Sequence, residues 1–324
     1  MNNLFKYLFY SVLLFFITTL IIRCDFDEIK SRATIGEMTI DVDANVEPLM
    51  IHLKKEFERL NPEAKLNLDF QPTKNVIAGL LNGDVSLIII TRDFDKEEKD
   101  FVDKHKIELQ RYNIAIDAIG FIVNTENPVS RLTSNDLKGI FTGGYSKWSQ
   151  IESQDEEQNK DVRKILTGNL DKIKLFIQRP NSSTYDYVKD SVLSGLEYSK
   201  ISQVCSTSVQ MLEMIRKNKN GIGISNLSWL SKGNQDKLDS TVKPLRVSRI
   251  RVSGRQEDFA QFHQGLIFNK TYPYRRNVIL YTTDFGIKLS TGLITFLLSK
   301  EGQKTILENG LVPLNQPIRT IQIN

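Results

Sequence analysis

Cysteine and histidine are scarce in this sequence. Its 324 residues include only Cys24 and Cys205, and its 3 histidines form neither an HExxH nor an HxH pattern. So few cysteines exclude a disulfide-dense scaffold and a CxxC zinc site. Ser182 has no histidine near it in the sequence to act as a base, which argues against nucleophilic catalysis. We therefore expect no metal, no cofactor and no enzymatic activity.

An excess of one sign of charge is also lacking. The chain has 43 Lys and Arg against 39 Asp and Glu, a formal net charge of +4, and the two signs alternate along it. This balance gives no electrostatic case for nucleic-acid binding. The content of 40% hydrophobic and 25% charged residues is typical of a soluble globular protein. The length allows one large core or two smaller ones.

Only one long apolar run occurs, from Tyr7 to Ile22. It is shorter than the ~20 residues of a membrane-spanning helix, so residues 1–23 are interpreted as a signal peptide. Cys24 resembles the lipidated cysteine of lipoproteins, although Arg23 replaces the small residue usual before it. The alternative is an uncleaved signal anchor next to an ordinary thiol. Either arrangement would tether the chain outside the cytoplasm, in the periplasm or at the cell surface.

From residue 35 onward, short β-rich runs alternate with amphipathic helical ones, which predicts an α/β, doubly wound architecture. The apolar residues of Glu47–Leu60 recur every three or four positions, as on a helix with one buried face. Val85–Ile90 is typical of a strand buried on both faces. Ile114–Val123 is long enough to cross between lobes, and the polar stretch 151–164 is interpreted as a surface insertion.

The most informative local sequence runs from a predicted strand end at Arg179 into a helix start at Ser182, Ser183 and Thr184. Open α/β sheets bind ligands at the carboxyl ends of strands, and a helix N-terminus attracts anions. The hydroxyls would donate hydrogen bonds, and Arg179 would grip an oxyanion with two parallel bonds. The alternative is that a serine merely caps the helix while Arg179 is a solvated surface charge.

Two other strand ends carry polar side chains. Thr91 and Arg92 follow the buried strand, and Asp43 and Asn45 follow the first strand. Each pair can equally belong to a simple helix cap. If the three loops meet at one edge of the sheet, they form a single rim around a ligand.

Several longer motifs extend along nearly the whole chain after residue 23 and occur in one order. They are Asp117–Asn124 with Asn127-Pro128, Leu132-Thr133, Leu137–Gly143 with Trp148, Gly221–Ile224, Tyr272-Pro273 with Arg275, Leu298–Gln303 and Gly310–Leu314. In this order, and with the Arg179 loop, the chain resembles the phosphate-binding protein of phosphate ABC transporters, within the type II periplasmic binding protein fold.

The resemblance implies two doubly wound α/β lobes joined by two crossing strands, with an anion gripped between them by hinge closure. It places residues 24–114 and 262–324 in lobe 1 and residues 115–261, including the polar insertion, in lobe 2. It also implies the ligand-binding residues. They are Arg179, Ser182, Ser183, Thr184, Thr91, Arg92, Asp43 and Asn45.

This chain departs from the family's pattern at two places. Ser183 stands where the family's anion loop has glycine, and Thr91-Arg92 stands where the family has Ser-Asp. In the family that aspartate accepts the proton of hydrogen phosphate and so rejects sulfate. Because the departure exchanges an acceptor for a donor, Asp43 is the acid in these loops that can take its place.

The sequence thus predicts a monomeric, membrane-tethered receptor that captures phosphate or a similar oxyanion for ABC permease subunits. The alternative is a tethered structural or sensory protein that keeps this fold but has lost high-affinity phosphate binding.

Overall fold

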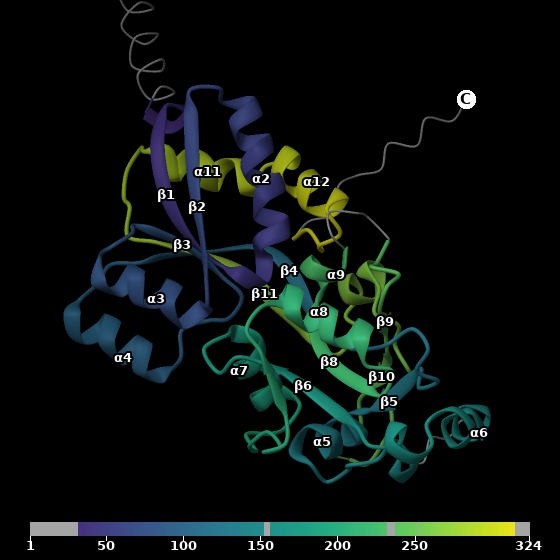
Figure 1. Cartoon of the computed structure of the whole chain (residues 1–324). Coiled ribbons are helices and arrows are strands. Elements are labelled where there is room, and N and C mark those ends of the chain that lie inside the picture. The colour runs from purple at the N-terminus through teal and green to yellow at the C-terminus, as the bar shows by residue number, and fades with distance from the viewer. Residues whose placement is uncertain (1–31, 152–155, 232–236, 252, 315–324) are drawn as a thin grey trace, which may run out of the picture.

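The computed structural model describes residues 32–151, 156–231, 237–251 and 253–314. The predicted signal peptide, residues 1–23, and Cys24 lie outside these ranges. Within them, no helix combines the length and the apolar character needed to cross a membrane. The described chain forms two lobes, one above the other in Figure 1.

One mixed sheet runs through both lobes of the described chain, in the order β2-β1-β3-β11-β4-β8-β6-β7. Strands β1, β2 and β3 are mutually parallel, β11 is antiparallel to β3 and β4, and β8 is antiparallel to β4 and parallel to β6. The bounds are β1 Gly36–Asp43, β2 Ala64–Gln71, β3 Leu87–Ile90, β4 Gln110–Val123, β6 Lys174–Gln178, β7 Gln203–Cys205, β8 Gly221–Asn226 and β11 Arg275–Thr282.

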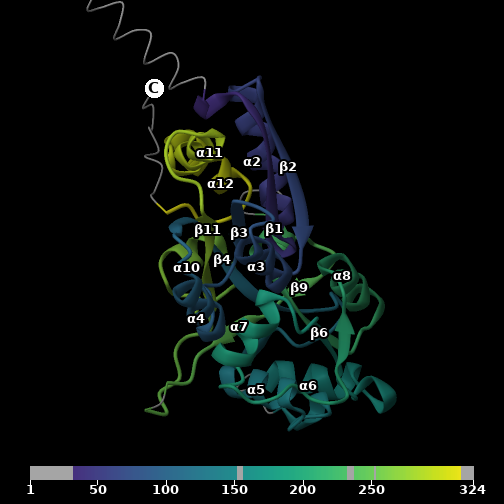
Figure 2. The same ribbon diagram turned by 90° about the vertical axis from the view of Figure 1, so that its left-hand side faces the viewer.

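In the first lobe, helices cover both faces of the sheet, as predicted for a doubly wound fold. Helices α2 (Glu47–Leu60), α11 (Leu289–Leu298) and α12 (Lys300–Glu308) lie on one face, and α3 (Thr73–Asn82) and α4 (Lys96–His105) on the other (Figures 1 and 2). Ile40 and Val42 of β1 pack in the α2 core. Since strand side chains alternate between faces, Asp41 and Asp43 point toward α3.

The second lobe is built around β6 and β8. Its helices include α5 (Ser134–Thr142), α6 (Glu156–Ile165), α7 (Ser183–Ser191), α8 (Ser208–Lys217), α9 (Leu227–Ser231) and α10 (Gln264–Phe268). Helix α6 lies in the predicted insertion 151–164, of which residues 152–155 are outside the described ranges. Phe262 and Tyr272 pack in this lobe's core, so the chain returns to the first lobe only through β11.

Strands β4 and β11 cross between the lobes. Strand β4 pairs with β11 from Gln110 to Ala118 and then with β8 from Ile119 to Val123. The sequence predicted a crossing run that begins at Ile114, but the strand begins four residues earlier, at Gln110. A bulge opposite Val278 and Ile279 absorbs the irregularity, because the register skips one residue there.

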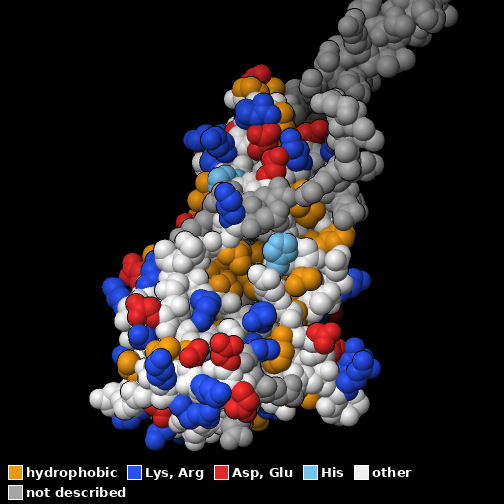
Figure 3. Space-filling view, turned by 90° about the vertical axis from the view of Figure 1, so that its right-hand side faces the viewer, with side chains coloured by type: hydrophobic (Ala, Val, Ile, Leu, Met, Phe, Trp, Pro, Cys, Tyr) orange, Lys and Arg blue, Asp and Glu red, His pale blue; other side chains and the backbone are white. Residues whose placement is uncertain are grey.

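The surface bears out the balance of charge. On the face shown in Figure 3, acidic and basic side chains are interspersed and form no field of one sign. Cys205 is buried and makes no disulfide, and burial raises the pKa of its thiol to about 11.

Candidate ligand-binding site

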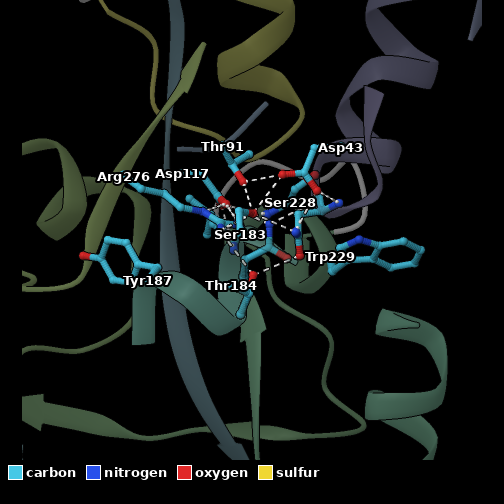
Figure 4. Close-up of polar contacts among 12 residues, drawn as sticks. Asp43, Thr91, Asp117, Ser183, Thr184, Tyr187, Ser228, Trp229 and Arg276 are labelled. Atoms are coloured by element: carbon cyan, nitrogen blue, oxygen red, sulfur yellow. Dashed lines mark hydrogen bonds and ion pairs between the residues drawn. The ribbon is translucent and has the colours of Figure 1, made fainter. Parts of the chain in front are cut away.

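The three loops predicted to form a rim meet between the lobes. Asp43 ends β1, Thr91 follows β3, and Ser183 begins α7, and all three side chains are fully buried. A fourth group comes from Thr73, the first residue of α3, which is equally buried. Figure 4 shows the side chains of Asp43, Thr91 and Ser183 turned toward one point.

The carboxylate of Asp43 is the main acceptor at this point. Its Oδ2 accepts hydrogen bonds from Thr73 Oγ1 at 2.8 Å, Thr91 Oγ1 at 2.7 Å and Ser183 Oγ at 2.8 Å. Its Oδ1 accepts from the backbone N–H of Asn45 at 3.0 Å and from Asn45 Nδ2 at 2.8 Å. A buried carboxylate requires such donors, so these contacts account for an acid at this position.

The hydroxyl of Ser183 lies in the middle of the cluster. Besides Asp43 it contacts Thr91 Oγ1 at 2.5 Å, and it receives hydrogen bonds from Asn45 Nδ2 at 3.0 Å and Arg276 Nη1 at 3.2 Å. Most of these partners belong to the first lobe or to β11, whereas Ser183 belongs to the second. The Ser183 hydroxyl therefore links the two sides of the cleft.

Arg276 is a member of this cluster that the sequence did not indicate. It comes from β11, is 6% exposed, and donates from Nη1 to Thr184 Oγ1 at 3.1 Å as well as to Ser183. Its Nε and Nη2 lie 2.9 and 2.8 Å from Asp117 Oδ2 on β4. Asp117 also accepts from Asn226 Nδ2 at 2.8 Å. One feature of the sequence could have revealed this pair: an acid lies in one buried strand and a base in another. A buried charge requires a partner of opposite charge.

Thr184 and Ser182 have different roles in the structure. Thr184 Oγ1 donates to Asn45 Oδ1 at 3.0 Å, which is a second bond across the cleft. The hydroxyl of Ser182 instead accepts from the backbone N–H of Tyr185 at 3.2 Å and caps α7. Ser182 is thus placed as a helix cap at the rim of the cluster.

Arg179 lies beside the cluster. It lines a cavity of about 220 Å³ together with Asp43, Asn45, Ser182 and Trp229. No acid within the described ranges forms an ion pair with its guanidinium, and burial lowers its pKa while the charge of Asp43 opposes that shift. Arg179 is therefore available to an anion entering this cavity.

Arg92 does not join the cluster. Its Nη1 and Nη2 each lie 2.7 Å from a carboxylate oxygen of Glu98, and its Nε lies 3.4 Å from Asp186. These two acids hold the guanidinium away from Asp43, although Thr91 next to it is a cluster member. The second cation of the candidate site, besides Arg179, is therefore Arg276 and not Arg92.

Comparisons with known proteins agree with this architecture. A family model described as the PBP superfamily domain matches residues 30–301. The chain is 24% identical over 292 residues to the phosphate-binding protein PstS of Pseudomonas aeruginosa, covering 88% of this chain and 85% of that protein. It is 23% identical over 311 residues to the PstS of Borreliella burgdorferi, covering 93% and 97%.

Two solved structures share the fold. A phosphate ABC transporter substrate-binding protein from Clostridium perfringens, with bound phosphate, matches with a TM-score of 0.69 and 22% identity over 86% of this chain and all (100%) of that one. An ABC-type phosphate transport receptor from Vibrio cholerae matches with a TM-score of 0.62 and 20% identity over 86% and 100%. These matches confirm the predicted fold of two α/β lobes.

Proposed function

Because the chain belongs to the PBP superfamily, we propose that it is an extracytoplasmic solute-binding protein that captures phosphate or a similar oxyanion between its lobes for an ABC-type permease. One observation carries this proposal. Hydroxyl and guanidinium donors from both lobes and a crossing strand converge on one buried point, beside Arg179, which pairs with no acid in the described part of the chain. The relatives described above are named as binding proteins rather than enzymes, in agreement with the expectation from the sequence.

The cluster offers the chemistry that hydrogen phosphate requires. Thr91, Ser183, Thr184 and Arg276 can donate to its unprotonated oxygens, and Asp43 can accept its proton. Sulfate carries no proton at neutral pH. One of its oxygens would therefore face the carboxylate of Asp43, and because both atoms are acceptors, no hydrogen bond could form. In the structure Thr91 and Ser183 donate to Asp43. Arg276 donates to Ser183 and Thr184, and Thr184 donates to Asn45. Binding must therefore replace contacts across the cleft with contacts to the ligand.

Delivery to a permease fits a chain held at the outer face of a membrane. We propose this tether from the leader alone, through either a lipidated Cys24 or an uncleaved signal anchor. A monomer suffices, because the cluster is completed within one chain.

A second candidate function is favoured by the position of Ser183. Its hydroxyl fills the middle of the cluster and already satisfies donors from Asn45 and Arg276. A protein of this fold that no longer binds phosphate tightly, and serves a structural or sensory role, would be consistent with such internal satisfaction.

Isothermal titration of the purified protein with phosphate, arsenate and sulfate separates these functions. Saturable binding of phosphate and arsenate, with sulfate much weaker, supports the phosphate receptor. Equal binding of all three supports a general oxyanion receptor, and no binding of any supports the second candidate.

A further inference from the structure

Asp41 is a buried carboxylate with no partner among the described residues. It lies two residues before Asp43 on β1, faces α3, and is 7% exposed. Within the described ranges, no donor or cation contacts its side chain, in contrast to the five hydrogen bonds that Asp43 accepts. A carboxylate that is largely shielded from water and has no partner is costly, so a positive charge beside it would be stabilising.

The carboxylate of Asp41 forms the floor of a surface hollow of about 420 Å³ between β1, β2 and α3. Asp69, its direct neighbour on β2, and Asp84, which follows α3, line the same hollow, and no Lys, Arg or His does. Burial, and next the charges of Asp69 and Asp84, raise the pKa of Asp41. The hollow is therefore short of positive charge.

Two features of α3 suit a cation in this place. Gly79 leaves the floor open, because a Cβ there would lie 2.8 Å from Asp41 Oδ2. The helix ends at Asn82, which also lines the hollow, so the negative end of its dipole lies there. Asn75 and Asn82 add amide oxygens as acceptors at the rim.

The shape of the hollow favours an organic cation over a metal ion. The described ranges contain no cluster of three or more His, Cys, Asp or Glu side chains placed to hold a metal. The acceptors are instead spread over a space much larger than one ion. A guanidinium or ammonium group can donate hydrogen bonds to several of these acceptors at once, since it carries several N–H groups.

We propose that this acidic hollow binds a small organic cation, whose guanidinium or ammonium group pairs with Asp41 at the floor. The site is separate from the interlobe cluster, because the hollow and the cavity beside Arg179 share no lining residue. The cation can be a free amine or a Lys or Arg side chain of a protein partner, and both present the same group.

Calorimetric titration of the full chain with agmatine, at constant ionic strength, tests the proposal. We expect saturable binding that is at least tenfold weaker in Asp41→Asn and unchanged in Asp100→Asn, which removes an exposed acid of α4. Gly79→Ala should weaken binding as well, because the added methyl group fills the floor without altering charge. Phosphate titration of Asp41→Asn should match the wild type, so this test stands apart from the proposed phosphate site.

Three further probes complete the experiment. Tetramethylammonium, which has charge but no N–H, should not bind. The peptide Gly-Gly-Arg-Gly-Gly presents the same guanidinium on a polypeptide, and tighter binding of the peptide than of agmatine would assign the hollow to a protein partner.

The proposal is overturned if agmatine does not bind, if Asp41→Asn binds it as the wild type does, or if only CaCl₂ gives binding that Asp41→Asn abolishes. Thermal melting should show that Asp41→Asn folds at least as stably as the wild type.

Discussion

Arg179 and Arg92 are both half-buried arginines near the cleft, but their surroundings differ. Arg92 is held by Glu98 and Asp186, whereas no acid among the described residues pairs with Arg179 beside its cavity. An arginine already paired with two carboxylates has little to offer an incoming anion. The free guanidinium of Arg179 is thus the one poised for binding.

This contrast predicts the effect of two matched substitutions. Arg179→Ala should weaken phosphate binding by about 2–5 kcal/mol, because a charge partner of a buried anion is lost. Arg92→Ala should leave the affinity close to that of the wild type. Titration calorimetry of both variants provides the measurement, and equal losses in the two would refute the distinction.

At the scale of elements, the crossing strands both connect the lobes and supply part of the site. Arg276 of β11 and Asp117 of β4 are register partners, and their side chains form an ion pair with exposures of only 3% and 0%. Asn226 of β8 donates to Asp117 and also to the carbonyl of Asn45 in the first lobe. The pair therefore fixes Arg276 where it reaches Ser183 and Thr184.

Breaking this pair should destabilise the fold. Asp117→Asn leaves the buried guanidinium of Arg276 without its counter-charge, and we expect unfolding to become easier by about 3–5 kcal/mol. The matched control is Glu37→Gln, which breaks an exposed pair with Lys65 and should change little. Urea unfolding of both variants checks this. Similar midpoints for Asp117→Asn and the wild type would show that the pair contributes nothing.

For the whole molecule, closure depends on a small set of contacts between lobes. Lys74 N donates to Asn181 O at 3.2 Å, Trp229 Nε1 donates to Ala44 O at 2.9 Å, and the polar cluster lies between them. Two ion pairs of Asp186 on α7 also join the lobes, with Arg92 at 3.4 Å and with Lys74 at 3.9 Å. Because all these contacts are polar, hinge opening exposes little apolar core.

The leader gives a prediction at the same scale. If Cys24 is acylated, Cys24→Ala should release the protein into a soluble extracytoplasmic fraction, since no second apolar run of spanning length follows it. Fractionation and immunoblotting of wild type and variant make the comparison. Retention of the variant in the membrane would instead support the uncleaved anchor.

The sequence contained most of the fold but only part of the candidate site. Helix α2 begins and ends where its apolar spacing predicted, because local periodicity and a buried face agree there. Asp43, Thr91 and Ser183 come together because strand ends share one edge of a sheet. Arg276 could not be found this way, because it lies near the start of β11 and not at the carboxyl end of a strand. Arg92 is diverted mainly by Glu98, six residues further along the chain, and also by Asp186, which only tertiary packing brings near.

The most direct test of the account is competition between phosphate and sulfate at neutral pH in the wild type and in Asp43→Asn. The account predicts that the wild type prefers phosphate and that the variant loses this preference, because an amide cannot accept the proton of hydrogen phosphate in the same way as the carboxylate. A wild type that binds sulfate as tightly as phosphate, or a variant that keeps the full preference, would contradict it.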